Sequence, residues 1–92
     1  MKLCKLNDDH YMFHCPGCEG GHMVRVRGGQ PMWYWNGSMD APTFVPSILV
    51  NKGRQNPSAH VCHSFVNAGV IQFLPDSTHK LAGQTVPIPE WE

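Results

Sequence analysis

Cys15-Pro16-Gly17-Cys18 is the stretch that decides what kind of small fold this chain can adopt. Two thiols at this spacing, on a turn made tight by proline and glycine, can point at one metal ion, and N–H groups of the turn can hydrogen-bond to the sulfurs. The pattern is typical of the first half of a tetrahedral metal site. Because Cys62, His63 and His79 lie far downstream, we expect one ion to join two distant parts of the chain.

The length and the charge of the chain set limits on fold and function. Its 92 residues suit a single domain, residues 1–92, with a core small enough for a structural metal to matter. The formal net charge is zero, so the charge does not favour nucleic acid as a partner. We expect no secretory signal and no membrane span, since no stretch nears the ~20 apolar residues that cross a bilayer. Four cysteines in such a reduced, cytosolic chain indicate a metal rather than disulfides.

The pattern of apolar residues and turns is mainly that of short β-strands. The clearest hairpin is expected around Asn67-Ala68-Gly69, and prolines at 42 and 46 favour an edge or end position for their segment. One short helix is expected near residues 77–82, ended by Gly83, and an exposed loop over residues 51–58. We therefore predict a small antiparallel β-sheet fold with one helix, stapled by a zinc-ribbon-like metal site. The expected strands cover residues 2–6, 11–14, 22–27, 32–35, 47–50, 60–66, 70–74 and 85–88.

The second half of the metal site can be assembled in more than one way. Cys62 and His63 are neighbours on an expected strand, so they point to opposite faces and only one of them can easily bind the ion. Our first choice of ligands is Cys15, Cys18, Cys62 and His79. The alternatives are His63 in place of Cys62, and His22, which follows the turn closely. Zinc suits such a set of thiolates and imidazoles.

Three catalytic interpretations of these residues compete with a structural metal. A redox role for the two cysteines would need a helix starting at Cys15, which the glycines that follow oppose. A zinc hydrolase would leave one coordination position open for water, with a spare histidine or Asp76 as base. Ser64 beside His63 is a poor nucleophile–base pair, because neighbours on a strand face apart. No catalytic residue is therefore assigned.

Short motifs spread over nearly the whole chain resemble those of a known family. They are Cys15-Pro16-Gly17-Cys18 with His22, Trp35-Asn36-Gly37, Pro42-Thr43-Phe44 with Pro46-Ser47, Cys62-His63-Ser64-Phe65-Val66, Gly69 with Ile71-Gln72-Phe73-Leu74, Asp76-Ser77-Thr78-His79, and Leu81-Ala82-Gly83-Gln84-Thr85-Val86. The pattern is similar to that of small proteins of unknown function from tailed bacteriophages and prophages. Some of these are named ammonia monooxygenases, although this chain lacks the length, membrane spans and ligand set of such an enzyme. The resemblance implies a phage origin and a zinc site, and no activity.

These observations predict a small phage-encoded zinc-binding protein that acts as a structural or protein-interaction module. It would serve as a virion component or as a binder of a host factor, in the host cytoplasm or in the virion. The expected partner is a phage or host protein, or further copies of the chain in an oligomer or virion, with neither nucleic acid nor membrane involved. The alternative function is a zinc-dependent hydrolase with an open coordination position.

Overall fold

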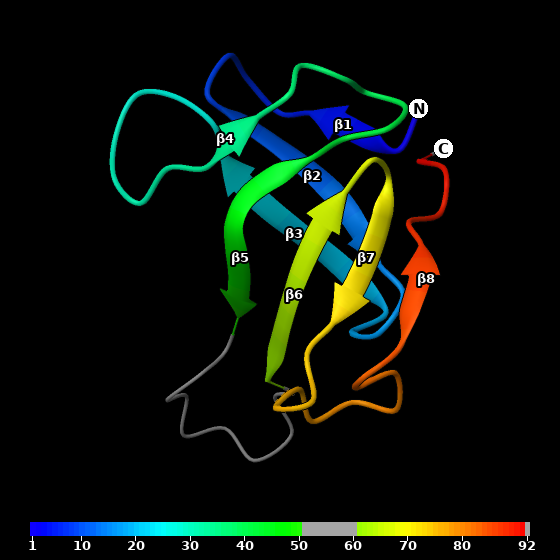
Figure 1. Ribbon diagram of the computed structural model, residues 1–92. Coiled ribbons are helices and arrows are strands. Elements are labelled where there is room, and N and C mark those ends of the chain that lie inside the picture. The colour runs from blue at the N-terminus through cyan, green and yellow to red at the C-terminus, as the bar shows by residue number, and fades with distance from the viewer. Residues whose placement is uncertain (51–60, 92) are drawn as a thin grey trace.

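The computed structural model describes residues 1–50 and 61–91, and the described part contains two antiparallel β-sheets. The smaller sheet has the strand order β1-β2-β3 (Figure 1). Its strands are β1 (Leu3–Lys5), β2 (His10–Cys15) and β3 (Gly20–Arg25). The turn that joins β2 to β3 is the Cys15–Cys18 stretch, which therefore closes a hairpin, with Cys15 paired to Gly20.

The larger sheet follows the chain order, β4-β5-β6-β7-β8. Its strands are β4 (Tyr34–Trp35), β5 (Phe44–Val50), β6 (Cys62–Asn67), β7 (Val70–Phe73) and β8 (Thr85–Pro87). The hairpin expected at residues 67–69 joins β6 to β7, with Asn67 paired to Val70. Ala68 and Gly69 both have positive φ, 50° and 80°, as the two-residue turn that matches strand twist requires.

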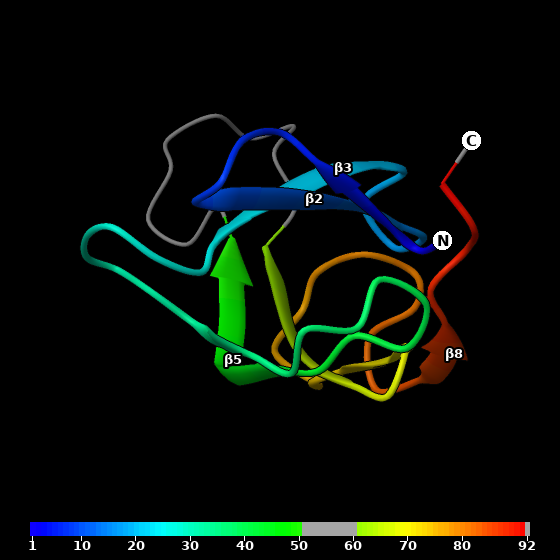
Figure 2. The ribbon, with the colours of Figure 1, turned by 90° about the horizontal axis from the view of Figure 1, so that it is seen from above.

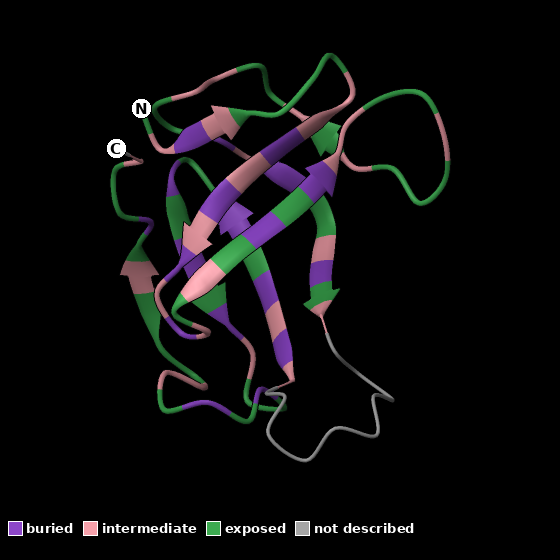
Figure 3. Cartoon of the chain, turned by 180° about the vertical axis from the view of Figure 1, so that it is seen from behind, coloured by how far each residue is buried: buried purple, intermediate pink, exposed green. Residues whose placement is uncertain are grey.

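The two sheets lie one above the other and enclose the core between them (Figure 2). Burial alternates along β2 and β6, so each strand turns every second side chain inward (Figure 3). Phe13 of β2 and Phe44 of β5 stack across the gap with ring centroids 6.4 Å apart. The sequence-based prediction of a mainly antiparallel β fold is confirmed, although it forms two sheets rather than one. The single domain over residues 1–92 stays a prediction.

The segment with two prolines does not lie at an edge or across an end, as expected, but enters an internal strand. Pro46 lies in β5, which is placed between β4 and β6. The strand tolerates it because the register of β5 against β6 shifts between Phe44 and Ile48, so the residues between them are outside the regular ladder. On its other side, β5 pairs with β4 only at Phe44 and Val45.

The prediction of a helix near residues 77–82 is wrong. The described part of the chain holds no helix, and this segment is a series of turns. Tertiary hydrogen bonds take up the backbone groups that a helix would need. Thr78 N–H donates to the carbonyl of Val61, and Gly83 N–H donates to that of Phe73. Gly83 has φ +79°, which also ends a helical conformation. Within residues 1–50 and 61–91, no helix is long and apolar enough to cross a membrane. The loop expected at residues 51–58 lies outside the described residues.

Candidate functional site

The turn after β2 is shaped to present two sulfurs on one side. Glu19 N–H donates to the carbonyl of Cys15 at 2.8 Å, and Cys18 N–H donates to the sulfur of Cys15 at 3.4 Å. A Cβ at Gly17 would overlap the imidazole of His79, so only glycine fits at that position. The turn is thus held both by its own backbone and by the segment that follows β7.

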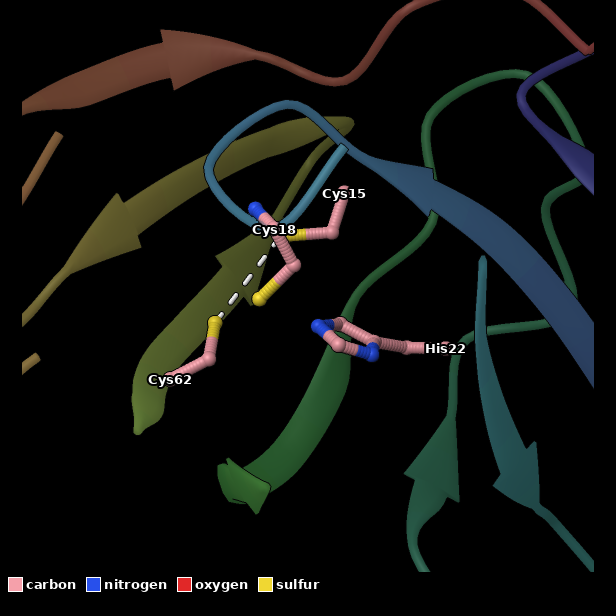
Figure 4. A group of neighbouring side chains, drawn as sticks. All are labelled: Cys15, Cys18, His22 and Cys62. Atoms are coloured by element: carbon pink, nitrogen blue, oxygen red, sulfur yellow. Dashed lines mark hydrogen bonds between the residues drawn. The ribbon is translucent and has the colours of Figure 1, made fainter. Parts of the chain in front are cut away.

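Four side chains from three strands and the turn converge between the two sheets: Cys15, Cys18, His22 and Cys62. Their ligand atoms all lie within 4.8 Å of one another, and Figure 4 shows the sulfurs and the imidazole facing a common centre. The sulfurs of Cys15 and Cys62 are 3.8 Å apart. Cys15 and Cys62 are fully buried, and His22 nearly so. This geometry suits a tetrahedral metal ion of the kind that thiolates and imidazoles bind.

The electrostatics of the cluster also suit a cation. The pKa of the Cys15 thiol is lowered, chiefly by the hydrogen bond from Cys62, while the hydrogen bond to Cys15 and burial raise the pKa of Cys62. Burial and then the nearby charge of Cys15 raise the pKa of Cys18 to about 11. Without a cation, the negative charge of one thiolate therefore opposes ionisation of the other two thiols. A bound metal ion stabilises all three thiolates. His22 Nε2 is buried without a hydrogen bond among the described residues, as a ligand atom would be.

The other ligands considered from the sequence lie elsewhere. His79, our first choice as fourth ligand, is not among the four residues whose ligand atoms lie within 4.8 Å of one another. Its ring packs edge-on against Phe73 at 4.5 Å and against Gly17, and its Nδ1 accepts a hydrogen bond from Leu81 N–H at 3.2 Å. His63 lies on the opposite face of β6 from Cys62, as strand alternation predicts.

A second site, which sequence reasoning missed, is built around His63. Its Nε2 lies 3.0 Å from the hydroxyl of Ser47, and its Nδ1 lies 3.0 and 3.2 Å from the two carboxylate oxygens of Asp76. An ionised carboxylate only accepts hydrogen bonds, so Nδ1 carries the proton and donates it to Asp76. In the neutral form of the ring with the proton on Nδ1, Nε2 is the atom that accepts a hydrogen bond from Ser47. A hydroxyl, an imidazole and a carboxylate stand in a row, in the same order as the side chains of a catalytic triad.

The fold places these three side chains by specific local features. Ser47 lies in the irregular part of β5, two residues before Leu49, which pairs with His63. Ser77 fixes the Asp76 turn to β6, because its hydroxyl accepts a hydrogen bond from His63 N–H and donates one to the His63 carbonyl. Asp76 is exposed, and Ser47 and His63 are partly buried, so the row is open to a substrate.

The triad left only weak signals in the sequence. Asp76-Ser77-Thr78 had the composition of a helix start, and Ser64 drew attention because it adjoins His63. Ser47 is 16 residues before His63, and only pairing of β5 with β6 brings them together. The available hint was that Ser47 follows Pro46, because a proline in a strand indicates a local irregularity. Such irregularities often reorient a side chain beside an active site.

A family model matches most of the chain. The sequence model of a family described as the serine protease of a bacterial ubiquitination-like system (BubE) matches residues 2–74. The match includes the Cys15–Cys18 turn, Ser47 and His63, and ends two residues before Asp76. No curated protein and no solved structure matches the chain. The description names a bacterial system, so it gives no support to the phage origin expected from the resemblance. Since the match covers most of its length, the chain belongs to the BubE family.

Proposed function

We propose that this protein is a serine peptidase in which Ser47 is the nucleophile, His63 the general base and Asp76 the residue that orients the base. The observation that carries the proposal is the 3.0 Å contact of Ser47 Oγ with His63 Nε2, on a ring whose Nδ1 is bound to Asp76. The family description, a serine protease, supports the same chemistry.

The reaction would proceed by acyl transfer. Ser47 Oγ attacks the carbonyl carbon of the scissile amide while its proton passes to His63 Nε2. The carboxylate of Asp76 stabilises the imidazolium that results. When the C–N bond breaks, Nε2 returns the proton to the leaving amine, and the acyl group stays on Ser47 as an ester. Water, deprotonated by the same nitrogen, then attacks the ester and frees the acid and the serine.

The cluster of Cys15, Cys18, His22 and Cys62 is proposed to hold a structural zinc ion. Three thiolates and one imidazole form a closed tetrahedral set, which leaves no position for a catalytic water. The cluster lies between the sheets, whereas His63 and Asp76 lie on the outer side of β6. We therefore prefer a serine peptidase to the zinc-dependent hydrolase considered from the sequence. His79 remains the alternative fourth ligand.

A non-catalytic interaction module, in a virion or bound to a host factor, is the competing function. It would explain the metal cluster but not the row of Ser47, His63 and Asp76. The partner that we propose is a protein substrate from the ubiquitination-like system named in the family description. We propose the bacterial cytoplasm as the place where the two proteins interact.

The experiment is reaction of the zinc-loaded protein with a small fluorophosphonate, followed by peptide mass analysis. An activated serine displaces fluoride and forms a Ser–O–P bond, so we expect one adduct, on Ser47. Ser47→Ala and His63→Ala should abolish it. Ser64→Ala is the matched control, because Ser64 adjoins His63 in sequence but its hydroxyl is buried on the inner face of β6. Absence of any adduct on folded, metal-loaded protein would count against the triad, and so would an adduct that survives in Ser47→Ala.

A further inference from the structure

A cavity lined in part by Trp33, whose indole N–H contacts the main chain of the proposed nucleophile, has no role in the triad or in the metal cluster. It has a volume of about 680 Å³ and lies between β4 with its preceding loop and the ends of the smaller sheet. This size falls within the ~300–1,000 Å³ of ordinary ligand pockets. Its walls are mainly aromatic and apolar: Tyr11, Val26, Met32, Trp33, Tyr34 and Trp35.

Trp33 connects this cavity to the catalytic serine. Its indole lines the cavity, and its Nε1–H donates to the main-chain carbonyl of Ser47 at 3.3 Å. Trp33 would therefore contact both a group seated in the cavity and the peptide unit that carries the proposed nucleophile. A pocket joined to the nucleophile in this way suits a peptidase, which has to hold a substrate side chain near the scissile bond.

The chemistry of the walls favours an apolar guest. The indole N–H of Trp35 already donates to the carbonyl of Ser38 at 3.0 Å, and that of Trp33 donates to the carbonyl of Ser47, so neither indole N–H is available to a guest in the cavity. Tyr11 and Trp35 also hold each other, with ring centroids 4.4 Å apart. A ligand that requires many hydrogen bonds would find few of these donors available.

The charges at the rim argue against an anionic guest. Lys5 pairs with Asp8 at 3.1 Å, and Arg27 lies 3.9 Å from Asp8 and 3.3 Å from Asp9. Each cation thus has a carboxylate partner, and Asp8 would repel a phosphate. A neutral, apolar side chain fits these walls better than a nucleotide or a phosphorylated group.

The edge of β5 offers a path for the rest of the substrate. Strand β4 pairs only with Phe44 and Val45, and the described residues place no strand beside the remainder of that edge. An extended chain could pair there as an added strand (Figure 1).

We propose that the cavity is a specificity pocket that takes a large apolar side chain from an extended polypeptide substrate lying along the part of β5, after Val45, that no described strand pairs on the β4 side. The proposal rests on the proposed peptidase function. It predicts that the enzyme selects such a residue at one position near the scissile bond and that Met32 and Tyr34 contribute to that choice. Both side chains line the pocket yet are 45% and 63% exposed, so their removal should not disturb the core.

The first test compares cleavage of a positional-scanning hexapeptide library by the native protein and by Met32→Ala/Tyr34→Ala. We expect native selectivity for a large apolar residue at one position, and a loss of about tenfold or more in kcat/KM for that peptide in the double variant. The rate of fluorophosphonate labelling should not change, because that small reagent does not need the pocket. Met23→Ala is the control, since Met23 is 58% exposed on β3 and does not line the pocket. Equal selectivity in native protein and double variant would overturn the proposal.

A second measurement does not depend on catalysis. In zinc-loaded Ser47→Ala, millimolar N-acetyl-phenylalaninamide should shift the indole N–H NMR signals of Trp33 and Trp35 saturably, and N-acetyl-alaninamide and inorganic phosphate should not. Trp91, which does not line the pocket, is the internal reference. If labelling fails but these shifts occur, the pocket stands and the peptidase function falls. If labelling succeeds and no shift occurs, the pocket proposal falls alone.

Discussion

The two faces of β6 place adjacent residues in different sites. Cys62 turns inward and lies with two other cysteines and His22 between the sheets. His63 turns outward and lies between Ser47 and Asp76. The inner cluster is buried and joins residues that are 47 apart in sequence, as in the contact between Cys15 and Cys62. The outer row is partly open and draws on β5, β6 and the turn after β7.

This difference shows how a small β-sheet can separate stability from chemistry. Strand alternation lets one strand contribute the proposed metal ligand to the core and the proposed base to the surface within two residues. A metal ion bound on the inner face would contribute stability, since a chain of this size has little core. The outer face contributes side chains held by hydrogen bonds. Substitutions on the two faces should therefore have separable effects.

The largest effect is expected from loss of the metal. Cys62→Ser, or a strong chelator, should unfold the protein, because structural zinc in small domains contributes on the order of 10 kcal/mol to folding. Metal content and the thermal unfolding transition are the measurements. His63→Ala, one residue away on the other face, should keep both its metal and its transition. Equal metal loss in the two variants would contradict the separation of the faces.

The next largest effect should be on catalysis alone. Asp76→Asn should lower kcat about 10⁴-fold, because the amide no longer fixes Nδ1–H of His63 toward an acceptor. Stability should change little, since Asp76 is exposed. The readout is hydrolysis of the best library peptide, with the melting temperature measured in parallel. Asp40→Asn is an exposed control and should match the native rate.

The fourth metal ligand can be assigned by comparing two histidines. His22→Ala should weaken zinc binding at least about a hundredfold, beyond the usual effect of a residue that only supports a ligand. His79→Ala should weaken it about tenfold, through lost packing on Gly17. Competition with a coloured zinc chelator measures both affinities. The reverse order would restore the ligand set first expected from the sequence.

A smaller effect is expected from the hydroxyl that joins the Asp76 turn to β6. Ser77→Ala removes two hydrogen bonds to the main chain of His63 and leaves one partly buried N–H without that partner. We expect a loss of about 1–3 kcal/mol in the free energy of unfolding, with a moderate fall in kcat and no change in metal content. Urea denaturation measures the first quantity. Thr85→Ala, on an exposed site of β8, should be neutral.

Local sequence patterns predicted those features that depend on local geometry. Turn residues predicted the hairpin at Ala68-Gly69 and the Cys15–Cys18 turn. Strand alternation predicted that Cys62 and His63 point in opposite directions. The prediction of a helix near residues 77–82 was wrong because the N–H groups of Thr78 and Gly83 donate to the carbonyls of Val61 and Phe73. No local pattern in the sequence reveals these tertiary hydrogen bonds. The pairing of Ser47 with His63 was missed for the same reason. It depends on how β5 lies against β6, and that register is a tertiary property.

The central claim is tested most directly by a crystal structure of the fluorophosphonate adduct, with anomalous data at the zinc edge. The account predicts phosphorus bonded to Ser47 Oγ, the hydrogen bond of His63 to Asp76 retained, and an anomalous peak among Cys15, Cys18, His22 and Cys62. An adduct on another residue, or a zinc ion bound by His63 and Asp76, would contradict it.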